Sequence, residues 1–533
     1  MISRPNSRTQ TNGNSSVSDT EKQPAGLLRS SAVVGVMTML SRVLGLVRDV
    51  VIAGYFGASG SADAFFVAFK IPNFLRRLFA EGAFSQAFVP VLSEYRSQRD
   101  LQAVQSLVYR VSGTLGSVLL AVTLVGVLGA PLLAALFAPG FYIAGGERFD
   151  LAAQMLRITF PYLALISMTA FCGAILNAYG RFAIPAFTPV LLNLTLIFSA
   201  VVLSPGFETP IMALAWGVFM AGALQLLFQL PFLARLQLVP VPQRGWRDEG
   251  VRRILKLMLP ALFGVSVAQI NLLLDTVLAS FLQTGSVSWL YYSDRLSELP
   301  LGVFGIAIAT VILPSLSRRH AERSPEHFRK TLDWAVRMVL LIGVPAAVAL
   351  VVLAEELLTT LFHYGTMTDL DIEMSARSLR AYALGLVAFM LIKVLATGFF
   401  ARQDTATPVK VAALAMAANM VFNLILVWPL AHAGLALATA LSAFMNAGLL
   451  LRGLLRDGVF HWQRGWGVFV LRMLLANGAL GALLIGFSRP VAEWLAADVW
   501  QRALWMSTLV FSGVALYAVV LFASGIRLRH LRG

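Results

Sequence analysis

Cysteine and histidine are scarce in this sequence, which has 533 residues but only one cysteine and six histidines. The single cysteine, Cys172, cannot form an intramolecular disulfide, and it excludes a metal site built from cysteines. No two histidines have the spacing of metal ligands, and there is no glycine-rich loop of the kind that binds nucleotides. These absences disfavour an ATP-driven pump.

Charge is scarce as well, since only 13% of the residues are charged and 58% are hydrophobic. A soluble domain carries about 25% charged residues. No polar stretch is long enough to enclose a core of its own, whereas many apolar stretches reach the roughly 20 residues that a membrane-spanning helix needs. We therefore predict an all-α polytopic membrane protein with about 14 spans. These spans lie near residues 29–55, 61–80, 103–137, 150–178, 184–204, 209–234, 252–282, 288–316, 331–361, 372–400, 407–428, 433–455, 466–487 and 501–525.

The placement of lysine and arginine predicts the orientation. These residues gather at the first terminus and in every second loop, and the intervening loops hold only Arg148, Arg489 and Arg502. Basic loops stay on the cytoplasmic side, so both termini are predicted to be cytoplasmic. The net charge of +15 then reflects loops beside anionic lipid and not binding to nucleic acid. Residues 1–28 are polar and are predicted to form a disordered cytoplasmic tail.

A weak internal repeat divides the spans into two sets. The pattern DxVxA occurs at residues 49–53 and 275–279, and PxLS occurs at 90–93 and 314–317, with nearly the same offset. Six spans separate the copies, so the halves would be parallel repeats with substrate bound between them. We expect an N-lobe at 29–235, a C-lobe at 236–456 and an added pair of spans within 457–533. The alternative is chance similarity between apolar segments.

Charged residues nevertheless occur inside the predicted spans. A charge at membrane depth is costly, so it usually faces a bundle interior or a water-filled cavity. Arginine suits phosphate because its guanidinium is planar, always charged and bidentate. The candidate anion-binding residues are Arg42, Arg48, Arg76 and Arg295. The alternative is that these arginines pair with carboxylates and only lock helices together, Arg48 with Asp49 and Arg295 with Asp294 or Glu298.

Further charged residues surround these arginines. Asp63 follows a loop without basic residues and is a candidate gating residue on the outer side. Arg77 could line the cavity, or its long side chain could extend to the membrane interface. Pro72 and Pro300 are predicted to interrupt the second and eighth spans beside the arginines. The candidate gating residues or charge partners are Asp49, Asp63, Lys70, Arg77, Glu81, Asp294 and Glu298.

A candidate cation site involves the seventh and eleventh spans. Asp275, Asn419 and Asn423 can offer oxygen ligands to a coupling cation such as sodium if these two spans pack together. For the two asparagines, hydrogen bonding between helices is an equally good explanation.

Several longer motifs resemble one family. They are SRVLGLVRD at 41–49, DAFFVAFKIPN at 63–73, LRRLFAEGAFSQAFVP at 75–90, YSDRLSELP at 292–300 and LPSLS at 313–317. They resemble the MurJ (MviN) family of bacterial lipid II flippases, and the resemblance covers nearly the whole chain after the polar tail. It implies the exporter fold of the multidrug/oligosaccharidyl-lipid/polysaccharide (MOP) superfamily. In that fold two six-helix lobes lie in a MATE-like arrangement, and two extra C-terminal helices form a groove for the lipid tail.

The resemblance also implies a function in peptidoglycan biosynthesis, cell wall biogenesis and cell shape. Family members move undecaprenyl-pyrophosphoryl-MurNAc-pentapeptide-GlcNAc from the cytoplasmic to the periplasmic leaflet of the inner membrane. Their cationic cavity holds essential arginines that match Arg42, Arg48, Arg76 and Arg295, and an acid that matches Asp63. Some members bind sodium between the seventh and eleventh helices, where Asp275, Asn419 and Asn423 are the candidates here, although an asparagine stands where a carboxylate would favour the ion.

Two other functions remain open from the sequence. A MATE-like drug or cation antiporter would prefer an acidic cavity, and a membrane enzyme acting on lipid-linked sugars would need a larger outer loop. A flippase implies no catalytic residue and no cofactor, with a monovalent cation or the membrane potential as the driving force. Its partners would be lipid II, membrane lipids and proteins of cell-wall synthesis.

Overall fold

The computed structural model describes residues 23–77, 84–321 and 324–526, and within these ranges the regular structure is helical, without strands. Nine helices there are long and apolar enough to cross a membrane, and one of them, Ala406–Arg456, has 51 residues. Each predicted span coincides with one helix, with consecutive helices, or with one part of this long helix. The prediction of an all-α polytopic protein is confirmed.

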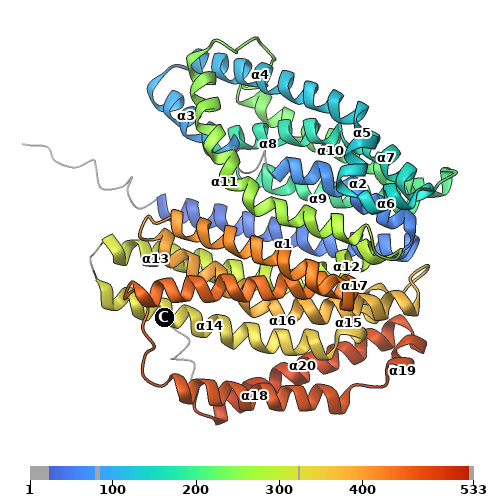
Figure 1. The fold of residues 1–533 in the computed structure, drawn as a ribbon. Coiled ribbons are helices and arrows are strands. Elements are labelled where there is room, and N and C mark those ends of the chain that lie inside the picture. The colour runs from blue at the N-terminus through green and yellow to red at the C-terminus, as the bar shows by residue number, and fades with distance from the viewer. Residues whose placement is uncertain (1–22, 78–83, 322–323, 527–533) are drawn as a thin grey trace, which may run out of the picture.

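Helices α2 to α10 of the first half lie together in the upper part of Figure 1, and α1 lies below them in the middle. Helix α1 packs on α9, α8 packs on α10, and α2 packs on α7. The elements are α1 (Gln23–Phe56), α2 (Gly60–Arg76), α3 (Ser85–Gln98), α4 (Leu101–Leu128), α5 (Ala130–Phe137), α6 (Pro139–Ala144), α7 (Glu147–Thr159), α8 (Tyr162–Ala178), α9 (Ala183–Phe198), the π-helix η2 (Ser199–Leu203), the 3-10 helix η3 (Ser204–Gly206) and α10 (Met212–Arg235).

The second half is built around α16, which contacts α12, α13, α14, α15 and α17. Helix α17 is broken at Ala431, where φ is 48°, so its two parts correspond to two predicted spans. The elements are α11 (Glu249–Ala279), α12 (Ser286–Pro300), η4 (Leu301–Gly305), α13 (Ile306–Ala321), α14 (Pro325–Val352), α15 (Ala354–Phe362), α16 (Asp369–Phe400), α17 (Ala406–Arg456), α18 (Trp466–Phe487), α19 (Val491–Ala496) and α20 (Val499–Ala523).

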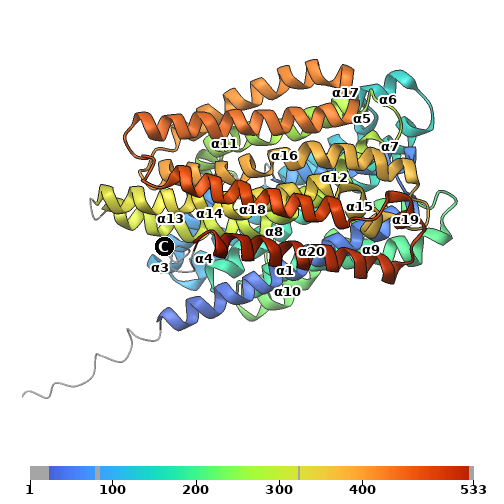
Figure 2. The same ribbon diagram turned by 90° about the horizontal axis from the view of Figure 1, so that it is seen from below.

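The last two long helices form a separate layer on the second half. Helices α18 and α20 pack on each other, α18 contacts α14, and α20 contacts α15 (Figure 1). Helix α1 begins and α20 ends at the same end of the bundle (Figures 1 and 2). The chain therefore crosses the bundle an even number of times between these two points.

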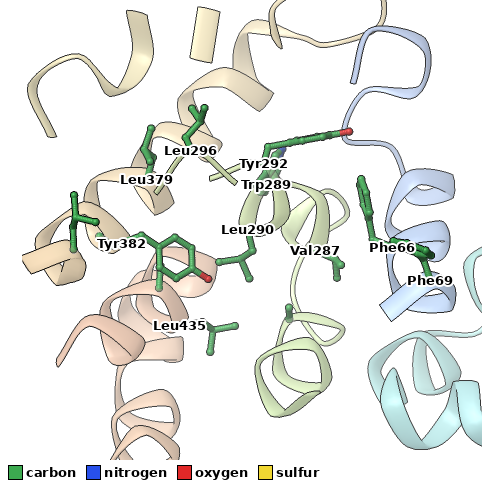
Figure 3. Close-up of a cluster of buried hydrophobic side chains, with 14 of the residues drawn as sticks. Phe66, Phe69, Val287, Trp289, Leu290, Tyr292, Leu296, Leu379, Tyr382 and Leu435 are labelled. Atoms are coloured by element: carbon green, nitrogen blue, oxygen red, sulfur yellow. The ribbon is translucent and has the colours of Figure 1, made fainter. Parts of the chain in front are cut away.

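Helix α12 joins the two halves. Phe66 and Phe69 of α2 lie on one side of it, and Leu379 and Tyr382 of α16 lie on the other (Figure 3). These side chains are buried, and burying one large apolar side chain stabilises a fold by about 1.5–3 kcal/mol in water. Inside a bilayer, close packing is the larger contribution. The Trp289 side chain of α12 also donates a hydrogen bond to Asp371 at the start of α16, at 2.8 Å.

The two predicted interruptions have different outcomes. The prediction for Pro72 is wrong, because α2 continues through this buried proline to Arg76. A proline removes one backbone hydrogen bond, and close packing around a membrane helix tolerates that loss. At Pro300 the irregularity is present, since α12 ends there and the π-helical turn η4 follows.

Both halves meet at one end of the bundle, which we call the closed end. The buried Asp63 carboxylate of α2 accepts hydrogen bonds from the backbone of Gly285, at 2.7 Å, and from the backbone and hydroxyl of Ser288, at 2.9 and 2.6 Å. The Tyr292 hydroxyl donates to the Gly57 carbonyl at 3.0 Å. These contacts connect the start of α12 to the α1–α2 turn.

Gly365 lets a second segment approach the closed end. Its φ is +59°, and a Cβ atom there would lie 2.1 Å from the Gly54 carbonyl oxygen of α1. The neighbouring Thr366 donates its backbone N–H to the same oxygen at 2.9 Å. Only glycine combines this backbone conformation with such a close approach.

We expect Gly365→Ala to destabilise the protein by at least about 1–2 kcal/mol, the usual cost of a left-handed non-glycine residue. Thermal unfolding of the full chain in nanodiscs measures the effect. The matched control is Gly116→Ala in α4, because nothing lies within 4 Å of a Cβ atom there. Equal melting temperatures for the two variants would contradict the proposed packing at Gly365.

Candidate functional site

A cavity of about 700 Å³ lies among α1, α2, α9 and α12. Its deep wall includes the buried Arg48 and Asp49, and its rim includes the exposed Thr38 and Asn177. The cavity therefore reaches the surface away from the closed end. Among the described residues, five arginines and two carboxylates line it, and together these carry an excess of three positive charges. They are Arg42, Arg48, Arg76, Arg77 and Arg295, with Asp49 and Glu298.

Arg48 is held rigidly in this wall, with only 4% of the residue exposed. Its guanidinium donates to Asp49 Oδ1 at 2.7 and 2.9 Å, and to Asn193 Oδ1 of α9 at 3.0 Å. The Asn193 amide in turn donates to the Ser41 carbonyl at 2.9 Å. Adjacent residues on a helix do not normally face each other, but the long Arg48 side chain turns back to Asp49.

Arg295 reaches the same carboxylate from the other half. Its Nε lies 3.1 Å from Asp49 Oδ2, and its Nη1 lies 3.4 Å from Glu298 Oε2. The Arg295 side chain is 36% exposed, so it is more accessible from the cavity than Arg48. The Tyr291 hydroxyl lies between the two arginines and donates to Asp49 Oδ1 at 2.9 Å.

The other arginines have different surroundings. Arg42 lies against Gly302, where a Cβ atom would sit 1.6 Å from Arg42 Nη1, so glycine makes room for the guanidinium. The Nε of Arg76 donates to Asn73 Oδ1 at 2.8 Å within α2. Arg77 lines this cavity and also a second one.

The second cavity, of about 170 Å³, lies on the other side of α12, among α2, α11, α16 and α17. Its charged residues balance, with three cationic and three anionic side chains. They are Lys70, Arg77, Arg295, Asp275, Asp294 and Glu298. A multiply charged anion is therefore better accommodated in the first cavity.

The candidate cation ligands lie partly at this second cavity. Asn423 donates its amide N–H to Asp275 Oδ1 at 2.9 Å, and the Thr439 hydroxyl lies 3.4 Å from Asp275 Oδ2. The side-chain oxygen of Asn423 is buried without a hydrogen-bond partner, so the oxygen donors fit a small cation. The Lys70 ammonium also interacts electrostatically with Asp275, so it competes with a bound cation for this carboxylate. Asn419 is fully buried.

The structure brings most of the described candidate residues to the walls of these two cavities, but not Asp63, Asn419 or Asn423. Asp63 belongs to the closed end and not to the cavity walls, and Glu81 lies outside the described residues. The ion pairs expected under the alternative interpretation are present, since Arg48 pairs with Asp49 and Arg295 pairs with Glu298. Arg295 pairs with Asp49 in addition, which the sequence reading did not include.

Sequence reasoning missed two residues of the site, Asn193 and Tyr291. Asn193 is a polar residue in an otherwise apolar span, and that signal could have identified it. Tyr291 directly precedes the YSDRLSELP motif, but a tyrosine near the end of a membrane span more often indicates an interfacial position.

Comparisons with solved structures define the class of protein. The helices superpose on an inward-facing multidrug resistance MATE family transporter of the MOP superfamily with a TM-score of 0.67, covering 80% of this chain and 98% of that one. At 16% identity this similarity concerns the fold alone. The class of protein defined here is a polytopic helical membrane protein with an arginine-lined cavity between its helices.

Closer similarities identify the family. A family model described as lipid II flippase MurJ matches residues 52–503. A Vibrio cholerae protein named probable lipid II flippase MurJ is 52% identical over 512 residues, which cover 95% of this chain and 98% of that protein. A structure of lipid II flippase MurJ in the inward closed conformation has a TM-score of 0.77 at 26% identity, covering 92% of this chain and 98% of that one. The chain belongs to the MurJ family.

The two arginines that share Asp49 should differ in their effect on stability. Arg48→Ala leaves a buried carboxylate with one cationic partner fewer, so we expect a loss of about 3 kcal/mol. Arg295→Ala should cost less than about 1 kcal/mol, because its side chain is partly exposed and Asp49 keeps Arg48. Thermal unfolding of both variants in nanodiscs tests this order, and a reversed order would contradict the geometry.

Proposed function

We propose that this protein is a lipid II flippase whose arginine-lined cavity binds the pyrophosphate of the lipid-linked peptidoglycan precursor. The observation that supports this most directly is the charge of the cavity, in which five arginines face two carboxylates. Guanidinium groups bind phosphate oxygens bidentately and keep their charge at any physiological pH. The substrate ligands in this proposal are Arg42, Arg48, Arg76 and Arg295, with Arg77 at the margin.

The direction of transport follows from the predicted orientation. The basic loops are proposed to be cytoplasmic and the closed end periplasmic, so the cavity would open toward the cytoplasm. The protein would lie in the inner membrane with both termini cytoplasmic. Lipid II would enter from the cytoplasmic leaflet, and movement of the halves would open the Asp63 contacts and expose the head group to the periplasm.

The prenyl chain is too apolar for an arginine-lined cavity, and it would stay in the bilayer or against the C-terminal helices. Helices α18 and α20 form a layer against α14 and α15 of the second half and present large exposed apolar side chains such as Phe487 and Phe511. We propose this layer, within residues 457–533, as the groove for the lipid tail. Contact with proteins of cell-wall synthesis stays a prediction.

The membrane potential is the proposed driving force. It is positive outside and favours outward movement of the anionic head group by about 2.3 kcal/mol per charge per 100 mV. Coupling to sodium is the alternative, through Asp275, Asn423 and Asn419. A bound sodium ion would add a positive charge beside α11, and these side-chain oxygens would hold it.

The other two functions have less support. A cation antiporter needs a cavity with excess negative charge, whereas this one has excess positive charge. The relatives are named flippases, which are transporters and not enzymes.

We expect Arg295→Ala to reduce outward transport of lipid II at least about tenfold, as expected for loss of a charge-assisted contact to phosphate. Lipid II should then stay in the cytoplasmic leaflet, which a leaflet-accessibility assay after rapid depletion of the unmodified protein measures. Arg295→Lys keeps the charge without the bidentate geometry and should be intermediate. Normal exposure of lipid II in Arg295→Ala, with the variant in the membrane, would contradict the site assignment.

We expect transport to persist when sodium is replaced by choline, because Lys70 already places a positive charge near Asp275. Lipid II transport in proteoliposomes at a fixed membrane potential measures this. A large loss of transport without sodium, restored by adding it back, would instead support the sodium alternative. Asp275→Asn should abolish that sodium dependence if the ion binds at this carboxylate.

A further inference from the structure

The Tyr291 hydroxyl makes contacts with three charged groups from both halves. It accepts hydrogen bonds from Arg48 Nη2 at 2.9 Å and Arg295 Nη2 at 3.3 Å, and it donates to Asp49 Oδ1 at 2.9 Å. A phenol has one hydrogen and can accept through its lone pairs, so these contacts saturate it. The Tyr291 ring also stacks on Phe66 of α2, with the ring centroids 4.0 Å apart.

Tyr291 lies on the same stretch of α12 that forms the closed end. Ser288, which binds Asp63, lies one turn earlier, and Tyr292, which binds Gly57, is the next residue. The partners are also close in the chain, since Asp49 lies in α1 and Gly57 directly follows the end of that helix. Since α12 is a continuous helix here, α12 cannot move away from α1 at the closed end while Tyr291 stays bound to Asp49 and Arg48.

We propose that Tyr291 is a positioning residue that holds α12 against α1 while the cavity is empty, and that the substrate anion releases this hold. The proposal rests on the proposed function, because the anion is the pyrophosphate of lipid II. It deepens that function by assigning the step that connects substrate binding to opening of the closed end.

The charge of the substrate anion explains how its binding would release α12 from α1. Arg295 is 36% exposed and lies where an anion in the cavity can reach it, whereas Asp49 is 1% exposed and fixed. A pyrophosphate bound to Arg295 competes with Asp49 and Tyr291 for the guanidinium, and its negative charge repels the Asp49 carboxylate. Each effect weakens the contacts between α12 and α1 around the Tyr291 hydroxyl.

The test variant is Tyr291→Phe, which keeps the ring on Phe66 and removes only the hydroxyl. We expect its closed end to open in the absence of lipid II. The open population should rise about tenfold, as expected for loss of one hydrogen bond to a charged group. The matched control is Tyr364→Phe, whose hydroxyl donates to Thr360 in the same half and does not connect the halves.

The opening can be measured as a distance between spin labels in the full chain in nanodiscs. Cys172→Ala removes the native cysteine, and Tyr55→Cys and Gln283→Cys place labels at exposed positions beside the closed end, one on α1 and one before α12. Distance distributions are recorded with and without lipid II. The parent should open on adding lipid II, and Tyr291→Phe should show the open distance in about a tenfold larger fraction than the parent does without it.

Identical distributions in Tyr291→Phe and the parent without lipid II would overturn the role of Tyr291. Opening to the same extent in Tyr364→Phe would also overturn it, because the effect would not then depend on the contact between the halves. A parent that fails to bind lipid II in these nanodiscs would contradict the proposed function instead. The comparison without lipid II decides the role of Tyr291 in either case.

Discussion

The buried Asp49 carboxylate is shared by a cation from each half of the protein, Arg48 from α1 and Arg295 from α12. A carboxylate at this depth is stable only when paired and hydrogen-bonded, so α12 has to stay close to α1 while no other anion is present. Asp63 of α2 also ties α12 to the first half, here with neutral partners, the backbone of Gly285 and the backbone and hydroxyl of Ser288. The arrangement of the two halves depends on satisfying these two carboxylates.

In the proposed function, a substrate anion replaces Asp49 as the partner of the arginines, and this exchange would suit the site to transport. The rigid binding of Arg48 keeps the cavity cationic, and the partial exposure of Arg295 gives the anion a first contact. The second cavity, with balanced charge, offers an anion no such advantage. The two cavities on either side of α12 therefore have different electrostatic roles, although Arg77, Arg295 and Glu298 line both.

Much of the fold could be predicted because apolar length and basic loops are local properties of the chain. The spans coincide with helices, and the arginines were expected inside the bundle because charge in a span has few alternatives. Pro72 shows the limit of local reasoning, since packing around α2 tolerates a residue that breaks exposed helices. Asn193 was missed because its role depends on Arg48, which is distant in the sequence and adjacent only in the fold.

The sequence by itself determined that the chain crosses a membrane many times, that arginines lie within the spans, and that its motifs are those of the MurJ family. These features follow from residue composition and order, which need no knowledge of contacts. Only the tertiary structure decided which carboxylate each arginine meets, that Asp63 belongs to the closed end, and that Tyr291 connects the site to it. Pairing between distant residues depends on how helices pack, and similar apolar faces allow many packings that a single sequence does not distinguish.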